Sequence, residues 1–258
     1  MSSPTACAPR GVPHGTTVLA LTYRDGVLIA GDRGTTRGNL IARRDLEEVH
    51  PADDHAAVVF AGSVGLALDL VKLYQGELTH FEKAEGIPMT LAAKANRLAG
   101  GIWQHLGPGH AAPRRRPAAG RLRRDGPDGE QGSVFGFDVA GGTYEKSGLH
   151  AEGSGSPYAR GALKKPFRPG MSRREAALAA LQYDAADDDS AAGGPDITRR
   201  VFPIVAVITE DGFERLAEAE TEQLSREMVE QRGGRTGRTR PCEPTGRPDA
   251  AVGAGRTA

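Results

Sequence analysis

Short runs rich in apolar and β-branched residues open the chain and predict strands. Two such runs, 17–22 and 27–31, are joined by Tyr23-Arg24-Asp25-Gly26. An Asp-Gly pair between two apolar runs is a strong hairpin signal. Another apolar run over 56–61 ends at Gly62 and predicts a further strand. The first part of the chain is therefore expected to be β-structure.

Helical spacing takes over after Gly62, because Leu66, Leu70, Leu73 and Leu78 recur three to five residues apart. The pattern also predicts helices over 89–105, 157–165 and 173–183, and strands over 133–139 and 201–208. Strands, helices, strands and helices follow in that order. This order predicts an α+β fold, a four-layer αββα sandwich of two antiparallel sheets with helices outside.

The composition fits a globular domain with a sizeable core. The chain has 258 residues, of which 38% are hydrophobic, and its 33 basic residues balance its 33 acidic ones. This balance gives no global field that attracts nucleic acid or an anionic membrane, and no apolar run is long enough to cross a bilayer. Cys7 and Cys242 lie near opposite ends and give no disulfide framework, which favours a cytoplasmic location.

Three segments are expected. Residues 1–15 lack the basic start and apolar stretch of a secretory signal and are interpreted as a propeptide. Residues 16–230 are expected to form the folded domain that carries the candidate chemistry described below. Residues 231–258 are rich in Gly, Arg, Thr and Pro, and we expect a disordered basic tail with no assigned function.

Residues 107–132 interrupt the pattern with many arginines and prolines. Burying unpaired arginine is costly and proline cannot donate to a ladder, so an exposed, atypical loop is expected here. Three explanations stay open: a surface insertion, a stretch read in a shifted frame of a GC-rich gene, and a basic RNA-binding patch. The last lacks aromatic residues between the basic ones on which bases could stack.

Candidate chemistry begins at Gly15-Thr16-Thr17, just where the first strand starts. Cleavage of the Gly15–Thr16 bond would give Thr16 both a hydroxyl nucleophile and a free α-amine. An amine with a pKa of roughly 7.7–8.0 can accept the hydroxyl proton near neutrality. The pattern is weak in isolation, because threonine is also a good strand residue.

Three further motifs strengthen this hypothesis: 58–65 (VVFAGSVG), 153–157 (GSGSP) and 187–196 (DDDSAAGGPD). Together with 38–47, 94–99, 159–165 and 198–203, they closely resemble the β-subunit of the actinobacterial proteasome core particle, an N-terminal-nucleophile hydrolase family. The resemblance covers roughly residues 14–105 and 133–220. The segments occur in register over most of the chain.

The resemblance implies a threonine-type endopeptidase with Thr16 as nucleophile and Asp32 beside it. Ser154 and Asp189 match the supporting serine and aspartate, and the backbone N–H of Gly62 would face the oxyanion. The implied walls of the P1 pocket are Thr35, Thr36, Arg37, Ala42, Leu46, His50, Phe60, Val64 and Leu68. These walls are mostly apolar, which favours an apolar P1 residue.

The resemblance also implies partners: α-type subunits, other β-subunits in a heptameric ring, and an ATPase ring that acts through the α ring. The substrates would be unfolded polypeptides, cleaved inside the chamber after autocleavage at Gly15–Thr16. No metal or organic cofactor is required, and the resemblance implies no nucleic-acid or membrane partner.

Two positions depart from the family. Glu48 stands where the family carries its catalytic lysine, and Ala192 stands where the family has serine or threonine. A carboxylate near the amine favours its protonated form and makes it a poor base. The alternative is therefore a catalytically impaired, structural β-type subunit. A third reading is an N-terminal-nucleophile amidohydrolase that acts on a small molecule.

Overall fold

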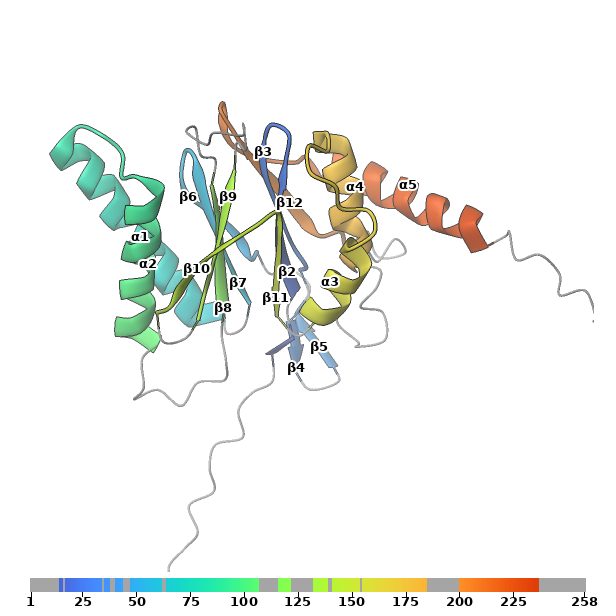
Figure 1. Cartoon of the computed structure of the whole chain (residues 1–258). Coiled ribbons are helices and arrows are strands. Elements are labelled where there is room, and N and C mark those ends of the chain that lie inside the picture. The colour runs from blue at the N-terminus through green and yellow to red at the C-terminus, as the bar shows by residue number, and fades with distance from the viewer. Residues whose placement is uncertain are drawn as a thin grey trace, which may run out of the picture.

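The computed structural model describes residues 14–15, 17–33, 35–37, 40–43, 47–61, 64–106, 116–121, 132–138, 141–153, 155–184 and 200–236. Only the backbone is described at 14–15, 35–37, 40–43, 64–66, 105–106, 116–121, 183–184 and 232–236. Two five-stranded antiparallel sheets lie side by side with helices on both outer faces (Figure 1). The predicted α+β sandwich is confirmed.

The first sheet is built around the N-terminal hairpin and has the strand order β11-β2-β3-β12-β13. Its strands are β2 (Thr17–Tyr23), β3 (Gly26–Gly31), β11 (Leu149–Gly153), β12 (Ile204–Thr209) and β13 (Gly212–Arg215). The predicted hairpin turn closes with Tyr23 opposite Gly26, and Gly26 has a φ of +157°. A Cβ at Gly26 would lie 2.0 Å from the carbonyl oxygen of Ile208, so only glycine fits there.

The second sheet has the order β10-β9-β8-β7-β6. Its strands are β6 (Val49–Asp53), β7 (Ala56–Ala61), β8 (Arg116–Arg121), β9 (Ser133–Phe137) and β10 (Thr143–Lys146). Strands β10 and β11 are consecutive in the chain but belong to different sheets, so the chain crosses between the sheets at Ser147 and Gly148.

Strand β8 corrects the prediction of a loop over the whole of 107–132. Residues 116–121 pair with β7 on one side, Phe60 opposite Pro117, and with β9 on the other, Ser133 opposite Arg121. The middle of this strand is Ala118-Ala119-Gly120, which carries neither charge nor bulk. Between β7 and β9 the backbone of this segment finds hydrogen-bond partners on both sides. These bonds outweigh the poor strand propensity of the flanking arginine and proline.

The helices form the outer layers. Helices α1 (Val64–Glu85) and α2 (Leu91–Leu106) cover the second sheet, and α3 (Ser156–Leu163) and α4 (Arg173–Asp184) cover the first, as Figure 1 shows. Helix α5 (Glu218–Thr236) packs against α4 on the far side. Because α5 ends at Thr236, the prediction that the disordered tail starts at 231 is wrong for 231–236. Residues 237–258 and the predicted propeptide up to residue 13 lie outside the described part of the chain.

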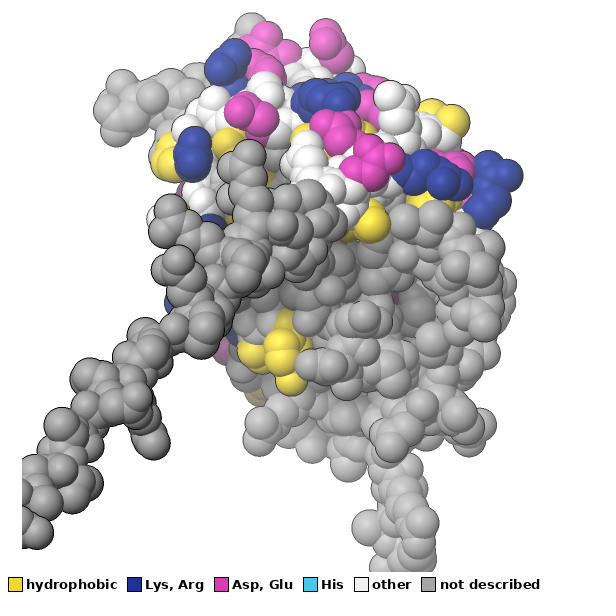
Figure 2. All heavy atoms as spheres, turned by 90° about the vertical axis from the view of Figure 1, so that its right-hand side faces the viewer, with side chains coloured by type: hydrophobic (Ala, Val, Ile, Leu, Met, Phe, Trp, Pro, Cys, Tyr) yellow, Lys and Arg dark blue, Asp and Glu magenta, His cyan; other side chains and the backbone are white. Residues whose placement is uncertain are grey.

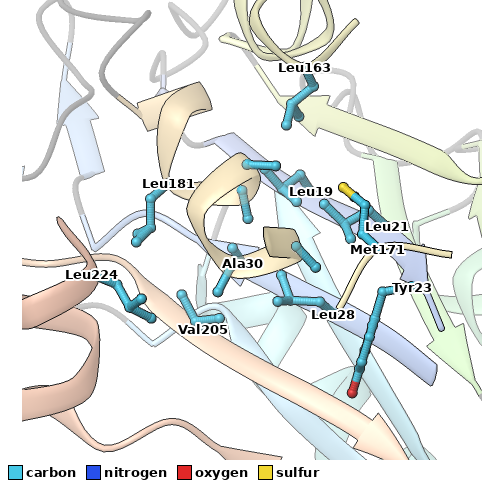
Figure 3. Close-up of a cluster of buried hydrophobic side chains, with 14 of the residues drawn as sticks. Leu19, Leu21, Tyr23, Leu28, Ala30, Leu163, Met171, Leu181, Val205 and Leu224 are labelled. Atoms are coloured by element: carbon cyan, nitrogen blue, oxygen red, sulfur yellow. The ribbon is translucent and has the colours of Figure 1, made fainter. Parts of the chain in front are cut away.

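Three apolar layers hold the sandwich together. The layer between the sheets contains Val18, Ala20, Ile29, Val59 and Ile208. Helices α1 and α2 bury a second layer against the second sheet, with Leu70, Leu98, Ile102, Phe60 and Phe137 at its centre. The third lies under α3 and α4, where Leu19, Leu21 and Leu28 of the hairpin meet Leu163, Leu181 and Met171 (Figure 3). Successive residues of β2 thus point alternately into two different layers.

Charged side chains of both signs cover the outer face of α4 and α5, where Figure 2 shows basic and acidic groups intermixed. Arg173 pairs with Glu214 at 2.7 Å and Arg174 pairs with Glu227. These groups are largely exposed, and such surface pairs contribute little to stability. Within the described ranges, no helix combines the length and apolar composition that crossing a bilayer requires.

Candidate active site

Asp32 lies immediately after β3 and is 4% exposed. Its Oδ2 accepts a hydrogen bond from the backbone N–H of Thr17 at 3.2 Å. Its own backbone N–H donates to the carbonyl oxygen of Thr17, also at 3.2 Å. Since Thr16 directly precedes Thr17, the fold brings the predicted Asp32 to within one residue of the predicted nucleophile.

The side chain of Thr17 joins this corner to helix α3. Thr17 is 1% exposed, and its Oγ1 accepts a hydrogen bond from the backbone N–H of Gly155 at 3.0 Å. Gly153, at the end of β11, is the cross-strand partner of Thr17. Residues 153 and 155, which flank position 154 in the chain, are thereby held beside the start of β2. Sequence analysis missed this role, and the only available signal was a hydroxyl side chain at the first position of a buried strand.

Glu48 points into the protein and is 4% exposed. A Cβ placed on Gly31 would lie 3.4 Å from Glu48 Cβ, 3.5 Å from Glu48 Oε2 and 3.5 Å from Val18 Cγ1. The carboxylate therefore lies at the end of the layer between the sheets. It is close to Gly31, the residue before Asp32, and Val18 lies near the same point. A buried acid occupies the position at which the resemblance implies a lysine.

The neighbouring Glu47 turns outward. It is exposed and accepts a hydrogen bond from Arg215 at 2.7 Å. This hydrogen bond is the main reason why the pKa of Glu47 lies below its ordinary value. Glu47 is therefore a surface residue, and of these two glutamates it is Glu48 whose side chain is buried.

A second buried acid flanks the start of β2. Glu152 is the cross-strand partner of Val18, so the two side chains share the face that looks into the inner layer. Glu152 Oε1 lies 3.0 Å from His150 Nε2, and both side chains are buried. They line a cavity of about 210 Å³ together with Gly136, Phe137, Asp138, Tyr144 and Lys146. Sequence analysis did not find this pair, because its residues look like ordinary polar positions of an edge strand.

Several predicted site residues lie outside the described residues: Thr16, Leu46, Gly62, Ser154 and Asp189, together with Ala192. Described neighbours bracket one of them, Gly62, because β7 ends at Ala61 and α1 begins at Val64. For five predicted pocket residues the structure gives the backbone only: Thr35, Thr36, Arg37, Ala42 and Val64. Their predicted roles stay predictions.

A small sheet with the order β1-β4-β5 lies next to this corner. Its strands are β1 (His14–Gly15), β4 (Thr35–Arg37) and β5 (Leu40–Arg43). Gly15 is opposite Thr36, and His14 is opposite Arg37. The last two residues before the predicted cleavage point are therefore paired as a strand with two of the predicted pocket residues, as an added peptide strand would be.

Two predicted pocket residues have described side chains on the second sheet. Phe60 is buried in the layer under α1 and α2. His50 lies on β6 and is half-buried, and burial lowers the pKa of its imidazole below the ordinary value. The neighbouring Glu47 opposes this shift but does not cancel it. Burial therefore favours the neutral form of this imidazole.

His50 makes unfolding pH-dependent. Its pKa is lower in the folded than in the unfolded chain, so between those two pKa values the unfolded chain binds more protons. The free energy of unfolding should therefore fall as the pH drops below about 6.5, the ordinary histidine value. We expect His50→Gln to flatten this fall in urea titrations at pH 7.5 and 5.5. An equivalent change at the exposed His80 serves as control, and an unchanged pH dependence in His50→Gln would contradict the assignment.

Among the described residues, no group of three or more His, Cys, Asp or Glu side chains could hold a metal ion. What this corner offers instead is a buried aspartate fixed to the backbone of Thr17, a fixed turn beside it, and a strand that carries the segment before Thr16. Such an arrangement suits hydrolysis by the first residue of a processed chain.

Comparison with known proteins agrees with this geometry. The proteasome subunit family matches residues 12–197. The chain is 70% identical over 240 residues to proteasome subunit beta 1 of Streptomyces avermitilis, covering 92% of this chain and 83% of that protein. It is 47% identical over 222 residues to a proteasome subunit beta of Streptomyces griseus, covering 85% and 78%. Proteasome subunit beta 2 of Thermomonospora curvata is 47% identical over 220 residues, covering 84% and 78%.

Proposed function

Since this chain belongs to the proteasome β-subunit family, whose members are threonine peptidases, we propose that it is a β-type subunit whose own hydrolytic site is impaired. One observation carries the proposal. Glu48 is buried, and its carboxylate lies close to Gly31, the residue before Asp32, with the side chain of Val18 near the same point. Near the predicted nucleophile, Glu48 would thus supply a carboxylate where the family's lysine would supply an ammonium group.

The reaction requires that the hydroxyl of Thr16 lose its proton as its oxygen attacks the peptide carbonyl carbon. In a processed chain the α-amine of Thr16 would take this proton, and a backbone N–H at Gly62 would donate to the oxyanion. Asp32 would hold the start of β2 through Thr17 N–H. The leaving amine then takes the proton, and water releases the acyl group from Thr16.

Glu48 acts against the first step. A carboxylate close to an amine stabilises its protonated form and raises the amine's pKa. An amine that keeps its proton cannot accept one from the hydroxyl, so general-base catalysis is lost. The same groups must cut the Gly15–Thr16 bond, so self-cleavage should be slow for the same reason. Ala192 also lacks the hydroxyl that the family has at this position, and the loss of this hydrogen-bond donor would lower activity further.

The leader would lie in the way of a substrate for as long as it is uncut. Residues His14 and Gly15 pair with β4, beside the predicted P1 pocket. An uncleaved leader in this place would occupy the strand position that an extended substrate needs. A chain that keeps its leader would be blocked as well as slow.

A specific observation favours the second candidate, an active threonine-type endopeptidase that self-cleaves at Gly15–Thr16 and degrades unfolded polypeptides. The corner formed by Thr17, Asp32 and Gly155 is intact, with three hydrogen bonds of 3.0–3.2 Å. An active endopeptidase needs such a scaffold to hold Thr16 in place, and its hydrogen bonds are present in this chain.

Family membership supports assembly with α-type and other β-type subunits in a core particle. We infer a heptameric β ring in the cytoplasm, served by an ATPase ring through the α ring. In this role the chain would supply ring contacts while a second β copy supplies hydrolysis.

The test is hydrolysis by rings assembled from this chain and its α-type partner in a host without other proteasomes. Impairment predicts that the hydrolysis of an unfolded polypeptide equals that of rings carrying Thr16→Ala. Hydrolysis that depends on Thr16 would support the endopeptidase instead. Size-exclusion chromatography of the same sample separates assembly from aggregation.

A further inference from the structure

We propose that Thr17 is a positioning residue, whose hydroxyl holds the turn entering α3 against the start of β2. The proposal concerns the nucleophile corner of the proposed function. It does not depend on whether Glu48 impairs that corner, because the contacts of Thr17 are made in the chain as it stands.

Three polar atoms of Thr17 each take part in a hydrogen bond. Its N–H donates to Asp32 Oδ2 at 3.2 Å, and its carbonyl oxygen accepts from Asp32 N–H at 3.2 Å. Its Oγ1 accepts from Gly155 N–H at 3.0 Å. The backbone of Thr17 thus fixes the end of β3, while the side chain alone fixes the start of α3.

Helix α3 depends on this contact. Its N-cap is Gly155, which has no side chain, and no side-chain hydrogen bond caps the helix. Gly155 is buried, so its N–H has little access to water in place of the hydroxyl of Thr17. Removing that hydroxyl would leave a buried donor without its partner and loosen the turn.

Valine is the right replacement because it keeps the shape and β-branching of threonine. Thr17→Val removes the acceptor for Gly155 and leaves both backbone hydrogen bonds to Asp32. Thr17→Ser keeps the hydroxyl and should therefore keep the hydrogen bond from Gly155 N–H. The matched control is Thr22→Val at the other end of β2, where Oγ1 donates to the carbonyl oxygen of Gly148 at 3.4 Å.

The first measurement is amide hydrogen exchange on the full chain in assembled rings. Pro157 has no amide hydrogen, so overlapping peptides around it narrow the signal to few residues. We expect exchange at Gly155 to be about tenfold faster in Thr17→Val. It should be unchanged in Thr17→Ser and in Thr22→Val. Equal protection of Gly155 in Thr17→Val and the wild-type chain would overturn the proposal.

The second measurement uses the Glu48→Lys background and separates kcat from KM. A positioning role predicts about a tenfold lower kcat in Thr17→Val with KM unchanged, and rescue by Thr17→Ser. An unchanged kcat in an active Glu48→Lys chain would overturn the catalytic part. Failure of Glu48→Lys to gain activity would count against charge as the cause of impairment, and the exchange result would still decide the role of Thr17.

Discussion

Rings that carry Glu48→Lys are expected to hydrolyse peptides about 100-fold faster than rings of the wild-type chain. A unit charge about 4 Å away changes the energy of a neighbouring charge by about 1–4 kcal/mol, depending on the effective dielectric. Reversing the charge replaces an attraction to the protonated amine by a repulsion of similar size, so the interaction energy changes by twice this amount. A rate change of a factor of 100 needs only about 2.7 kcal/mol. The measurement is the initial rate with a fluorogenic peptide, together with the fraction of chains that start at Thr16.

The matched control is Glu47→Lys, which reverses the charge of the adjacent residue. Glu47 is exposed and paired with Arg215, so its reversal should change the rate less than about twofold. Glu48→Gln removes the negative charge without adding a positive one. Its rate should therefore lie between those of the wild-type chain and Glu48→Lys. Equal rates for Glu47→Lys and Glu48→Lys would show that the buried charge is not what limits this site.

Adding Ala192→Thr to Glu48→Lys should increase leader cleavage further, because it restores a hydroxyl at a second position of the same site. The two effects need not add, since both act on one network. Recovery of leader cleavage with both changes would show that the defect lies in the active site. Failure of both changes to restore cleavage would indicate that the defect lies in residues 107–132.

Asp53→Asn is expected to lower the free energy of unfolding by about 3 kcal/mol. Asp53 forms an ion pair with Lys94 of α2, whose side chain is 3% exposed. Asparagine keeps an oxygen for the hydrogen bond that Asp53 Oδ1 accepts from His55 N–H at 2.9 Å. What is lost is the charge that balances a buried ammonium group. Urea unfolding of the isolated chain measures the effect.

Lys94→Met in the same chain should recover most of the loss, because it removes the uncompensated charge and fills the space with an apolar side chain. Asp54→Asn is the control, since Asp54 is exposed and its change should stay within about 0.5 kcal/mol. A loss in Asp54→Asn as large as that in Asp53→Asn would point to the hairpin turn rather than the ion pair.

The fold was largely predictable because local pattern and tertiary context agree over most of the chain. The hairpin of β2 and β3 has both a turn signal and two apolar runs, and it lies at the centre of its sheet. Strand β8 was not predictable, because its sequence opposes a strand and only its neighbours β7 and β9 provide the reason for one. The extension of α5 past 230 was also not predictable, because its glycines and arginines give no local signal for a helix.

The site was predictable only as a set of positions. The sequence places Asp32 after a strand, but the reciprocal hydrogen bonds with Thr17 come from the register of β2 and β3. Whether Glu47 or Glu48 faces inward was also open, because both precede a strand. The structure decides it through the packing of Glu48 on Gly31 and the pairing of Glu47 with Arg215.

The most direct test of the central claim is the intact mass and N-terminal sequence of this chain after assembly with its α-type partner. Impairment by Glu48 predicts assembled rings in which the Gly15–Thr16 bond is uncut and the leader is retained. A chain that starts at Thr16 in the wild-type protein, but not in Thr16→Ala, would show self-cleavage and contradict the account.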